Sequence, residues 1–508
     1  MASHNSHCVV ITFPLQSHIN PALQFAKHLA NSGASVTFLL AVSAHRRISN
    51  NTSTNLINTS SQITFLPFSD GYDDGIKSGD DGKNFMSEFK KRATEALTDL
   101  IRTSEEESCP VTCLVYTLLL PWAAEVATSL GVSSALLWIQ PALVFDLYYY
   151  YFNGFKDEIM KVVNNDVDAV ELPGLPCKLT CTDFPSFFVP SNAYSAVSLA
   201  IFEEQFKILK STATATAAAA PPRVLVNTFD ELEPEALKAL QGSVELIAIG
   251  PLVPSAYLGG KDSSDTCFGG DMFESSQQKC TKWLNTKAKN SVVYVSFGSL
   301  IVLKRRQVEE IARGLLDTGR PFLWVLRRVS PTPDSNVPSD ADEEHVRRLI
   351  DEINNRGDDD QQGLIVEWCS QVEVLSHNSI GCFVSHCGWN STLEGLVVGV
   401  PMVAFPQWTD QGTNAKLIEE AWGTGVRVIK RSLVVEVKKD GGGEDGKEEI
   451  VESEEVKRCV EIVMGEGERG EEIKRNVEKW RGLARKAVQD GGSSERNLVA
   501  LLQEMGRD

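Results

Sequence analysis

The chain has 508 residues, of which 42% are hydrophobic and 23% charged, and this size and balance predict two or three ordinary globular domains. Its 49 basic and 68 acidic residues give a formal charge of −19 without a long Lys/Arg run, which argues against a nucleic-acid or anionic-membrane partner. Eleven scattered cysteines, no signal-peptide core and no apolar run of ~18 residues predict a cytoplasmic protein with reduced thiols and no membrane insertion.

The first 250 residues show the rhythm of a parallel α/β sheet. A continuous apolar run over residues 8–13 predicts a strand buried on both faces, followed by a loop over residues 14–19. Asn20-Pro21 is predicted to open an amphipathic helix, which Gly33 ends before a second strand over residues 35–40. Further strands are predicted at 63–68, 113–116, 134–138 and 223–227, with helices at 122–130 and 231–240. The alternation predicts a doubly wound parallel sheet.

Two prolines and a glycine in residues 249–254, followed by a low-complexity stretch over residues 259–278, predict a domain boundary. A second series then begins, with strands expected at 291–295, 322–326, 363–367, 381–385 and 401–405 and a helix at 306–315. We therefore expect an α/β fold of two Rossmann-like doubly wound domains facing each other across a cleft. Its parts are an N-terminal domain 1–250, a linker 251–280, a C-terminal domain 281–483, and a C-terminal helix 484–508 packing back on the N-terminal domain.

In such sheets, ligands bind beyond the carboxyl ends of the strands, which here are the loops 14–19, 296–299 and 385–391. The last loop precedes a helical stretch that Asn390 and Ser391 are predicted to cap. The free N–H groups and partial positive charge of a helix start suit a diphosphate, to which His386 can also donate. Glu394 can accept hydrogen bonds from ribose hydroxyls, and Trp368 offers a flat face for a uracil ring.

Three blocks, Trp368-Cys-Ser-Gln371, His386-Cys-Gly-Trp-Asn-Ser-Thr-Leu-Glu394 and Pro406-Gln-Trp-Thr-Asp-Gln411, closely resemble the signature of plant family 1 UDP-dependent glycosyltransferases, which act on secondary products. The likeness extends to Ser17-His-Ile-Asn-Pro21, Ile249-Gly-Pro251, Val293-Tyr-Val-Ser-Phe-Gly-Ser299 and Gly491-Gly-Ser-Ser494, so that it spans nearly the whole chain. It implies that the two-domain fold is of the GT-B type. It also implies UDP-glucose as donor substrate, with no metal and no other cofactor.

The resemblance implies a UDP-sugar site made of Ser299, Trp368, Cys369, Gln371, His386, Trp389, Asn390, Ser391, Glu394, Asp410 and Gln411. In it, Trp368 and Gln371 bind the uridine and Glu394 binds the ribose. The diphosphate is held by Ser299, His386, Asn390 and Ser391, and the sugar is contacted by Trp389, Asp410 and Gln411. A glutamine at the position of Gln411 usually accompanies glucose in this family.

By the same resemblance, His18 is the catalytic base of an inverting glucose transfer. Its ordinary pKa of about 6.5 leaves the imidazole largely neutral at cytosolic pH. In many members of the family an Asp orients this histidine, but here that position holds Thr117, which can hydrogen-bond an imidazole without balancing its charge. His18 then acts alone, or another carboxylate reaches it, or the acceptor needs little deprotonation.

Thr117, followed by Leu-Leu-Leu-Pro-Trp122, also resembles the subgroup of anthocyanin 5-O-glucosyltransferases and related flavonoid, hormone or apocarotenoid glucosyltransferases. The expected partner besides the UDP-sugar is therefore a small apolar or aromatic plant metabolite, glucosylated on a hydroxyl or, as a glucose ester, on a carboxyl. The aromatic run Tyr148–Tyr151 is a candidate for its pocket and equally for the core. We expect a monomer.

Metal binding and dinucleotide binding have weaker support in the sequence than UDP-sugar binding. Cys369, His377, Cys382, His386 and Cys387 crowd together, but no Cys-x-x-Cys pair indicates zinc. Two Asp-x-Asp matches, at residues 166–168 and 340–342, lie in polar segments predicted as loops, as do the acidic stretches 340–344, 358–360 and 440–455. No Gly-x-Gly-x-x-Gly follows the first strand, which argues against a dinucleotide dehydrogenase. Because of Thr117, a non-catalytic UDP-sugar-binding protein remains the alternative.

Overall fold

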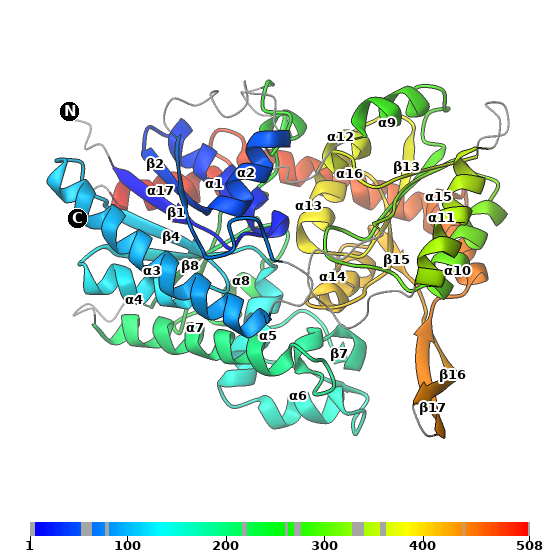
Figure 1. Ribbon diagram of the computed structural model, residues 1–508, viewed down its shortest axis with the longest axis horizontal. Helices are drawn as coiled ribbons and strands as arrows, with labels where there is room; N and C mark the ends of the chain where they lie inside the picture. Colours follow the sequence, from blue (N-terminus) through cyan, green and yellow to red (C-terminus); the bar gives the residue numbers. More distant parts are fainter. Residues whose placement is uncertain are drawn as a thin grey trace. The chain divides into compact units, whose positions relative to one another are not determined.

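The computed structural model describes residues 6–51, 63–76, 81–215, 221–259, 263–268, 276–327, 340–355, 362–439 and 442–505. The chain forms two compact units. Unit 1 contains Met1–Glu274, Trp408–Asn414 and Trp480–Asp508, and unit 2 contains Ser275–Gln407 and Ala415–Lys479. Each unit is built around its own parallel sheet (Figure 1).

The sheet of unit 1 has seven strands in the order β3-β2-β1-β4-β5-β8-β9, and every neighbouring pair is parallel. The strands are β1 (His7–Ile11), β2 (Ser35–Ala41), β3 (Ile63–Phe68), β4 (Cys113–Thr117), β5 (Ser133–Trp138), β8 (Arg223–Val226) and β9 (Glu245–Ala248). All residues of β1 and β4 are buried, because helices cover a parallel sheet on both faces. This burial explains why residues 8–11 of β1 are all apolar, without alternating polar positions.

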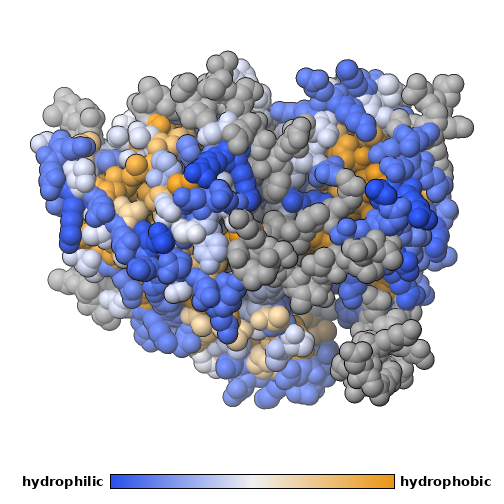
Figure 2. Space-filling view, viewed as in Figure 1, coloured by the Kyte–Doolittle hydropathy of each residue, from blue (hydrophilic) through white to orange (hydrophobic). Residues whose placement is uncertain are grey.

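The main helices of unit 1 are α1 (Gln16–Asn31), α2 (Val42–Asn51), α3 (Gly82–Glu106), α4 (Pro121–Ser129), α5 (Ala142–Phe152), α6 (Lys156–Val163), α7 (Ser195–Ala215), α8 (Ala236–Ala239) and α17 (Ser493–Met505). Helix α3 shows how they pack: Phe85, Phe89 and Leu97 repeat on one buried face. Its other face carries charged residues and belongs to a largely hydrophilic surface (Figure 2). Apolar periodicity thus decides which side of the helix meets the sheet.

The helix predicted at residues 231–240 is shorter than expected. Only α8 is α-helical there, because Pro234 lacks a backbone N–H and disfavours a helical conformation in the residue before it. At the other end of the chain, α17 packs beside β9 through Ser494 Oγ, which donates to Gly250 O (2.5 Å), and Asn497 Nδ2, which donates to Ala248 O (2.9 Å).

The sheet of unit 2 has six parallel strands in the order β12-β11-β10-β13-β14-β15. They are β10 (Val292–Ser296), β11 (Phe322–Val325), β12 (Gly363–Val366), β13 (Ile380–Ser385), β14 (Met402–Ala404) and β15 (Gly425–Arg427). The helices are α9 (Gln277–Leu284), α10 (Arg305–Asp317), α11 (Asp340–Asn354), α12 (Gln371–Leu375), α13 (Trp389–Val398) and α15 (Ser453–Met464). Helices α14 (Gln411–Lys416) and α16 (Glu468–Val488) each contribute residues to both units. One buried core joins β10, β11 and β13 to α10 and α15.

Two acidic stretches predicted as loops are regular structure. Residues 340–344 form the beginning of helix α11. Residues 440–455 include strand β17 (Gly442–Ile450), which pairs with β16 (Arg431–Lys439) in an antiparallel hairpin, and the start of α15. Residues 358–360 lie outside the described residues.

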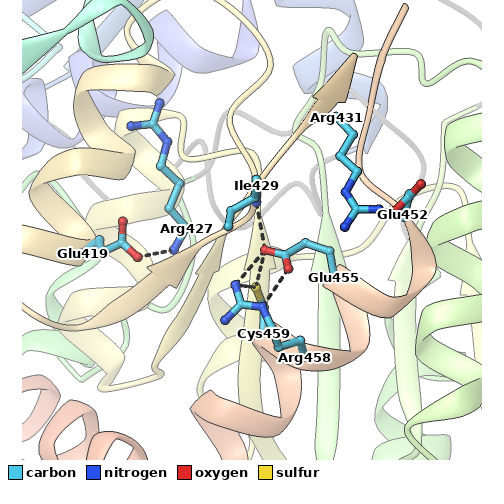
Figure 3. A network of polar contacts seen from close by, with 8 residues as sticks. All are labelled: Glu419, Arg427, Ile429, Arg431, Glu452, Glu455, Arg458 and Cys459. Carbon is cyan, nitrogen blue, oxygen red and sulfur yellow. Dashed lines mark hydrogen bonds and ion pairs between the residues drawn. The ribbon is translucent and has the colours of Figure 1, made fainter. Parts of the chain in front are cut away.

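Ion pairs and hydrogen bonds surround the base of this hairpin (Figure 3). Glu455 accepts from the Ile429 N–H (2.9 Å) and from both ends of the Arg458 guanidinium (2.7 Å each). Arg431 pairs with Glu452 at 2.6 Å. Charge alone therefore does not mark a loop, because acidic residues near a helix start can anchor a neighbouring strand.

Among the described residues, no helix is long and apolar enough to cross a membrane.

Candidate active site

His18 lies in the first turn of helix α1, not in a loop. The helix begins at Gln16, directly after N-cap residue Leu15, whose carbonyl accepts the His18 N–H at 2.9 Å. Pro21, predicted to open the helix, lies in its second turn, where its ring presets a helical φ at the cost of one backbone hydrogen bond. The loop 14–19 is therefore shorter than predicted, and the helix start holds the His18 backbone.

The imidazole of His18 is buried near aromatic rings, and one of its nitrogens has no hydrogen-bond partner among the described residues. The side chain is 8% exposed, and the Phe13 ring centroid is 5.8 Å from that of His18. Phe13 in turn contacts Phe85 and Phe89. In the described part of the chain, the Nδ1 atom of His18 has no hydrogen-bond partner. Because burial penalises the charged imidazolium, the pKa of His18 falls to about 4.

Thr117, at the end of β4, is fully buried, and its hydroxyl lies 3.1 Å from that of Thr12. The pairing follows from the register of β1 with β4, in which Ile11 is opposite Tyr116, so the next residues on each strand meet. Thr12 was not recognised as a site residue, although it is a polar residue that interrupts the apolar run 8–13. The Thr117 hydroxyl therefore has a partner on the neighbouring strand.

His386 follows strand β13, beside the loop that follows β10. The two strands pair with Ser296 opposite Ser385, so their carboxyl ends lie side by side. A Cβ added at Gly298 or Gly388 would lie 2.6 Å or 2.5 Å from His386 Nε2, and Gly298 has φ +75°. The positive φ favours glycine at position 298, and at both positions the absence of a Cβ lets the backbone approach the ring closely.

The titration of His386 resembles that of His18. Burial lowers the pKa of His386 to about 4, against a smaller raising effect of a hydrogen bond to the Ser296 backbone. Its Nδ1 is also without a partner among the residues described. Ser299 lies in the half-buried turn that follows Gly298. This loop pair thus presents a neutral imidazole beside glycine-rich backbone, which suits the approach of a phosphate.

Helices α12 and α13 are joined by a hydrogen-bonded cluster. Gln371 Nε2 donates to Ser391 Oγ (2.8 Å) and to Glu394 Oε2 (2.9 Å). The Tyr294 hydroxyl donates to Gln371 Oε1 at 3.4 Å. The N-cap of α13 is Gly388, without a side-chain cap, so Asn390 and Ser391 are the second and third residues of the helix and not the caps that the sequence predicted. Glycine fits there because His386 leaves no room for a Cβ.

The cluster continues to Trp368 and Cys369, which follow β12. Trp368 is half-buried, with the Arg327 guanidinium 6.0 Å from its ring centroid, and the Cys369 thiol lies 3.6 Å from the Tyr294 hydroxyl. Tyr294 was not predicted as a site residue, although it lies within the strand block 293–299. A half-buried ring beside buried hydrogen-bonding groups offers a stacking face with polar groups at its edge.

Two tryptophans and the tyrosine run have packing roles. The buried Trp389 ring lies 6.0 Å from that of Trp422, and half-buried Asn390 is the second residue of α13. In unit 1, the Tyr148 ring stacks on Phe202 with centroids 4.3 Å apart. Tyr151 likewise stacks on Phe188 at 4.5 Å. The aromatic run therefore contributes to the core of unit 1.

Asp410 and Gln411 belong to unit 1, unlike the residues of the α12–α13 cluster. Asp410 accepts hydrogen bonds from Thr409 Oγ1 (2.8 Å) and Asn414 Nδ2 (2.7 Å), while burial raises its pKa. Gln411 Oε1 accepts from the Trp408 N–H at 3.0 Å. The structure thus divides the predicted site residues into two sets: His18, Thr117, Asp410 and Gln411 in unit 1, and the rest in unit 2.

No metal centre accompanies these groups in the described ranges, where no set of three His, Cys, Asp or Glu side chains could hold an ion. Asp166 and Asp168 lie in a turn after α6, and all eleven cysteines are free thiols.

Known proteins resemble this chain over nearly its whole length. Residues 268–436 match the family model described as UDP-glucoronosyl and UDP-glucosyl transferase. The chain is 51% identical to a phloretin 4'-O-glucosyltransferase of Malus domestica, covering 98% of this chain and 97% of that one. It is 50% identical to a crocetin glucosyltransferase, chloroplastic, of Gardenia jasminoides (99% and 98% covered). It is 47% identical to an anthocyanidin 3-O-glucoside 5-O-glucosyltransferase of Verbena hybrida (98% and 99%).

Among solved structures, Os79 from O. sativa in complex with UDP superimposes with a TM-score of 0.75 at 31% identity. The match covers 98% of this chain and all of that one. The predicted fold of two doubly wound domains, of the GT-B type, is therefore confirmed, as is the resemblance to anthocyanin 5-O-glucosyltransferases.

Proposed function

Because the chain belongs to the UDP-glycosyltransferase family, and is thus an enzyme of the hexosyltransferase class, we propose the reaction that it catalyses. Glucose passes from UDP-glucose, with inversion at the anomeric carbon, to a phenolic hydroxyl or a carboxyl group of a small plant metabolite. The observation that supports this proposal is the hydrogen-bonded cluster of Gln371, Ser391 and Glu394, whose polar groups suit a nucleoside and which lies close in the chain to Trp368. Family membership favours the enzyme over the alternative of a non-catalytic UDP-sugar-binding protein.

The donor is held by groups whose chemistry matches its parts. Trp368 stacks on the uracil ring, with Cys369 and Gln371 at its edge, and the Glu394 carboxylate accepts hydrogen bonds from the ribose hydroxyls. The start of α13, with Asn390 and Ser391, binds the diphosphate together with His386 and Ser299. Trp389, Asp410 and Gln411 contact the sugar. No metal and no further cofactor takes part.

The transfer is a single displacement at the anomeric carbon. The acceptor oxygen forms a bond to this carbon while the carbon–oxygen bond to the β-phosphate breaks, and UDP leaves with the electron pair. His18 takes the proton of the acceptor, and the groups around the diphosphate stabilise the charge that develops on UDP. The neutral imidazole is ready for this role because burial keeps it unprotonated.

The acceptor class follows from the weakness of this base. An imidazole with a pKa of about 4, whose Nδ1 has no carboxylate partner among the described residues, gains little by taking a proton from an aliphatic alcohol. A phenol is easier to deprotonate, and a carboxylic acid of pKa ~4–5 is already ionised at neutral pH. The relatives named for phloretin, for anthocyanidin 3-O-glucoside and for crocetin fit acceptors of this kind.

We further propose that the enzyme is a monomer in the cytoplasm. Free thiols at all eleven cysteines agree with a reducing compartment, although one relative is named chloroplastic. A fluorescent fusion in plant cells and the sedimentation of the purified protein test these two statements.

The reaction is tested by incubating the purified protein with UDP-glucose and a panel of phenols, carboxylic acids and aliphatic alcohols of similar size. We expect UDP release with phenols and acids, β-linked products by NMR, and no loss of rate with EDTA. Binding of UDP-glucose without transfer to any acceptor would contradict the proposed reaction. Faster transfer to aliphatic alcohols than to phenols would contradict the acceptor class.

A further inference from the structure

The stretch Trp408–Asn414 belongs to unit 1, although the chain before and after it belongs to unit 2. It carries Asp410 and Gln411, to which the proposed function assigns contacts with the sugar. The contacts that hold this stretch in place therefore also position the two side chains that would distinguish one sugar from another. The contacts that fix it come from residues 182–194.

Ser186 and Thr409 form a reciprocal pair of hydrogen bonds. The Ser186 N–H donates to the Thr409 carbonyl (2.8 Å), and the Thr409 N–H donates to Ser186 Oγ (2.8 Å). Asn192 Nδ2 also donates to this hydroxyl oxygen, at 3.1 Å. Thr409 has φ +55°, a left-handed conformation that is unfavourable for a β-branched residue. The pair with Ser186 stabilises Thr409 in this conformation, directly before Asp410.

Two further contacts hold the other end of the stretch. The buried Thr413 Oγ1 donates to the Asp183 carbonyl at 2.6 Å. A Cβ added at Gly412 would clash with the Thr182 carbonyl oxygen, so only glycine allows this approach. The Trp408 ring lies 6.3 Å from Phe187 and 5.9 Å from Tyr194, between centroids. Backbone, hydroxyl and ring contacts thus hold the stretch on both sides of Asp410 and Gln411.

We propose that Ser186 is a positioning residue for the donor sugar, with Thr413 as a second support. Ser186 does not touch the substrate. It orients Thr409 and thereby sets where the Asp410 carboxylate, which accepts from Thr409 Oγ1, and the Gln411 amide lie. Loss of this support displaces the sugar-contacting groups and leaves the uridine-binding residues, which lie in unit 2, unchanged. This inference rests on the proposed function, in which Asp410 and Gln411 contact the sugar.

The test compares UDP-glucose with UDP-galactose, its epimer at a single sugar hydroxyl, as donors for Ser186→Ala. We expect the preference for UDP-glucose, measured as a ratio of kcat/KM values, to fall at least about fivefold, because small displacements weaken discrimination between hydroxyls. The affinity for UDP, measured by calorimetry, should stay within about twofold. Ser186→Thr, which keeps the hydroxyl, should retain the wild-type ratio.

Ser104→Ala is the matched control. Ser104 is another serine of unit 1 whose hydroxyl accepts a backbone N–H, that of Val111 at 3.2 Å, but it is buried and lies on α3, whereas Ser186 is half-buried. Ser104→Ala should lower the melting temperature to a similar degree without changing the donor ratio. Thr413→Val against Thr413→Ser repeats the comparison at the second support, with a change expected only for valine.

Two outcomes separate this inference from the proposed function. If Gln411→Ala changes the donor ratio while Ser186→Ala and Thr413→Val behave like Ser104→Ala, the positioning role is wrong and the sugar assignment stands. If Gln411→Ala leaves the donor ratio unchanged, the sugar assignment itself fails, and the positioning role fails with it.

Discussion

His18 in unit 1 and His386 in unit 2 have nearly the same titration but different surroundings. Each follows a buried parallel strand, each is buried, and each has a pKa lowered to about 4. The ring of His18 lies near that of Phe13, while two glycines approach the ring of His386. A histidine next to aromatic rings suits an apolar acceptor, and a histidine that glycine backbone approaches closely suits a phosphate. The role of a histidine therefore follows from its neighbours more than from its pKa.

Substitution of His18 gives the largest expected effect and tests the first half of this comparison. His18→Ala should lower kcat by about 10²–10⁴-fold, because a general base is lost, while UDP binding is kept. Steady-state kinetics with a phenolic acceptor measures this. His45→Ala, on α2, is the control and should keep the wild-type kcat. Wild-type turnover in His18→Ala would show that the base is misassigned.

Substitution of His386 should act on donor binding. His386→Ala should raise the dissociation constant of UDP by ~10–100-fold, since a hydrogen bond to a charged group contributes ~1.5–3 kcal/mol. Calorimetry with UDP measures the change. His377→Ala is the control in the same unit, since His377 instead pairs with Ser379. A loss of kcat without a loss of UDP affinity would contradict the inference that His386 serves donor binding while His18 serves catalysis.

The pH dependence of kcat/KM tests the lowered pKa of His18, and its expected effect is smaller than those of the two substitutions. His18 acts as a base only when it is neutral, so activity is lost as the pH falls through its pKa, here about 4. A histidine with an unshifted pKa of ~6.5 would be about three-quarters protonated at pH 6. We therefore expect almost constant kcat/KM between pH 7.5 and 5.5, with an acid limb centred near 4. A limb near 6.5, with the fold intact by circular dichroism, would contradict the burial of His18.

Thr117 is expected to matter for stability more than for catalysis. Thr117→Val leaves the Thr12 hydroxyl without its partner and should cost about 1–3 kcal/mol of folding free energy, with kcat changed less than about threefold. Replacing both threonines by valine should cost less than the sum of the single changes, which chemical denaturation can resolve. A tenfold fall in kcat for Thr117→Val would instead indicate that Thr117 orients His18.

Much of the fold could be predicted because buried parallel strands leave a clear signal. Runs such as residues 8–11 and 322–326 are continuously apolar, and the strands that were predicted lie within one or two residues of their observed bounds. The strands β9 and β15 were not predicted. Helix starts were predicted less well. The sequence placed the start of α1 at Asn20, since proline commonly opens helices, but the structure starts it at Gln16.

The site was predicted unevenly for a physical reason. Gln371, Ser391 and Glu394 lie within one short window, and the structure brings them together. The pairing of Thr12 with Thr117, and that of Ser186 with Thr409, joins residues more than a hundred positions apart. Such pairs depend on strand register and backbone approach, which no local pattern of residue types contains.

The composition of unit 1 from three separate stretches has a consequence for biosynthesis. Its first stretch ends at Glu274, but the hydrogen bonds from Ser494 and Asn497 to Gly250 and Ala248 can form only when residues 494–497 have left the ribosome. At about 5–20 residues per second, roughly 10–50 s pass before unit 1 can close. All residues of unit 2 leave the ribosome before this last stretch of unit 1. Unit 2 can therefore finish folding first, although unit 1 begins the chain.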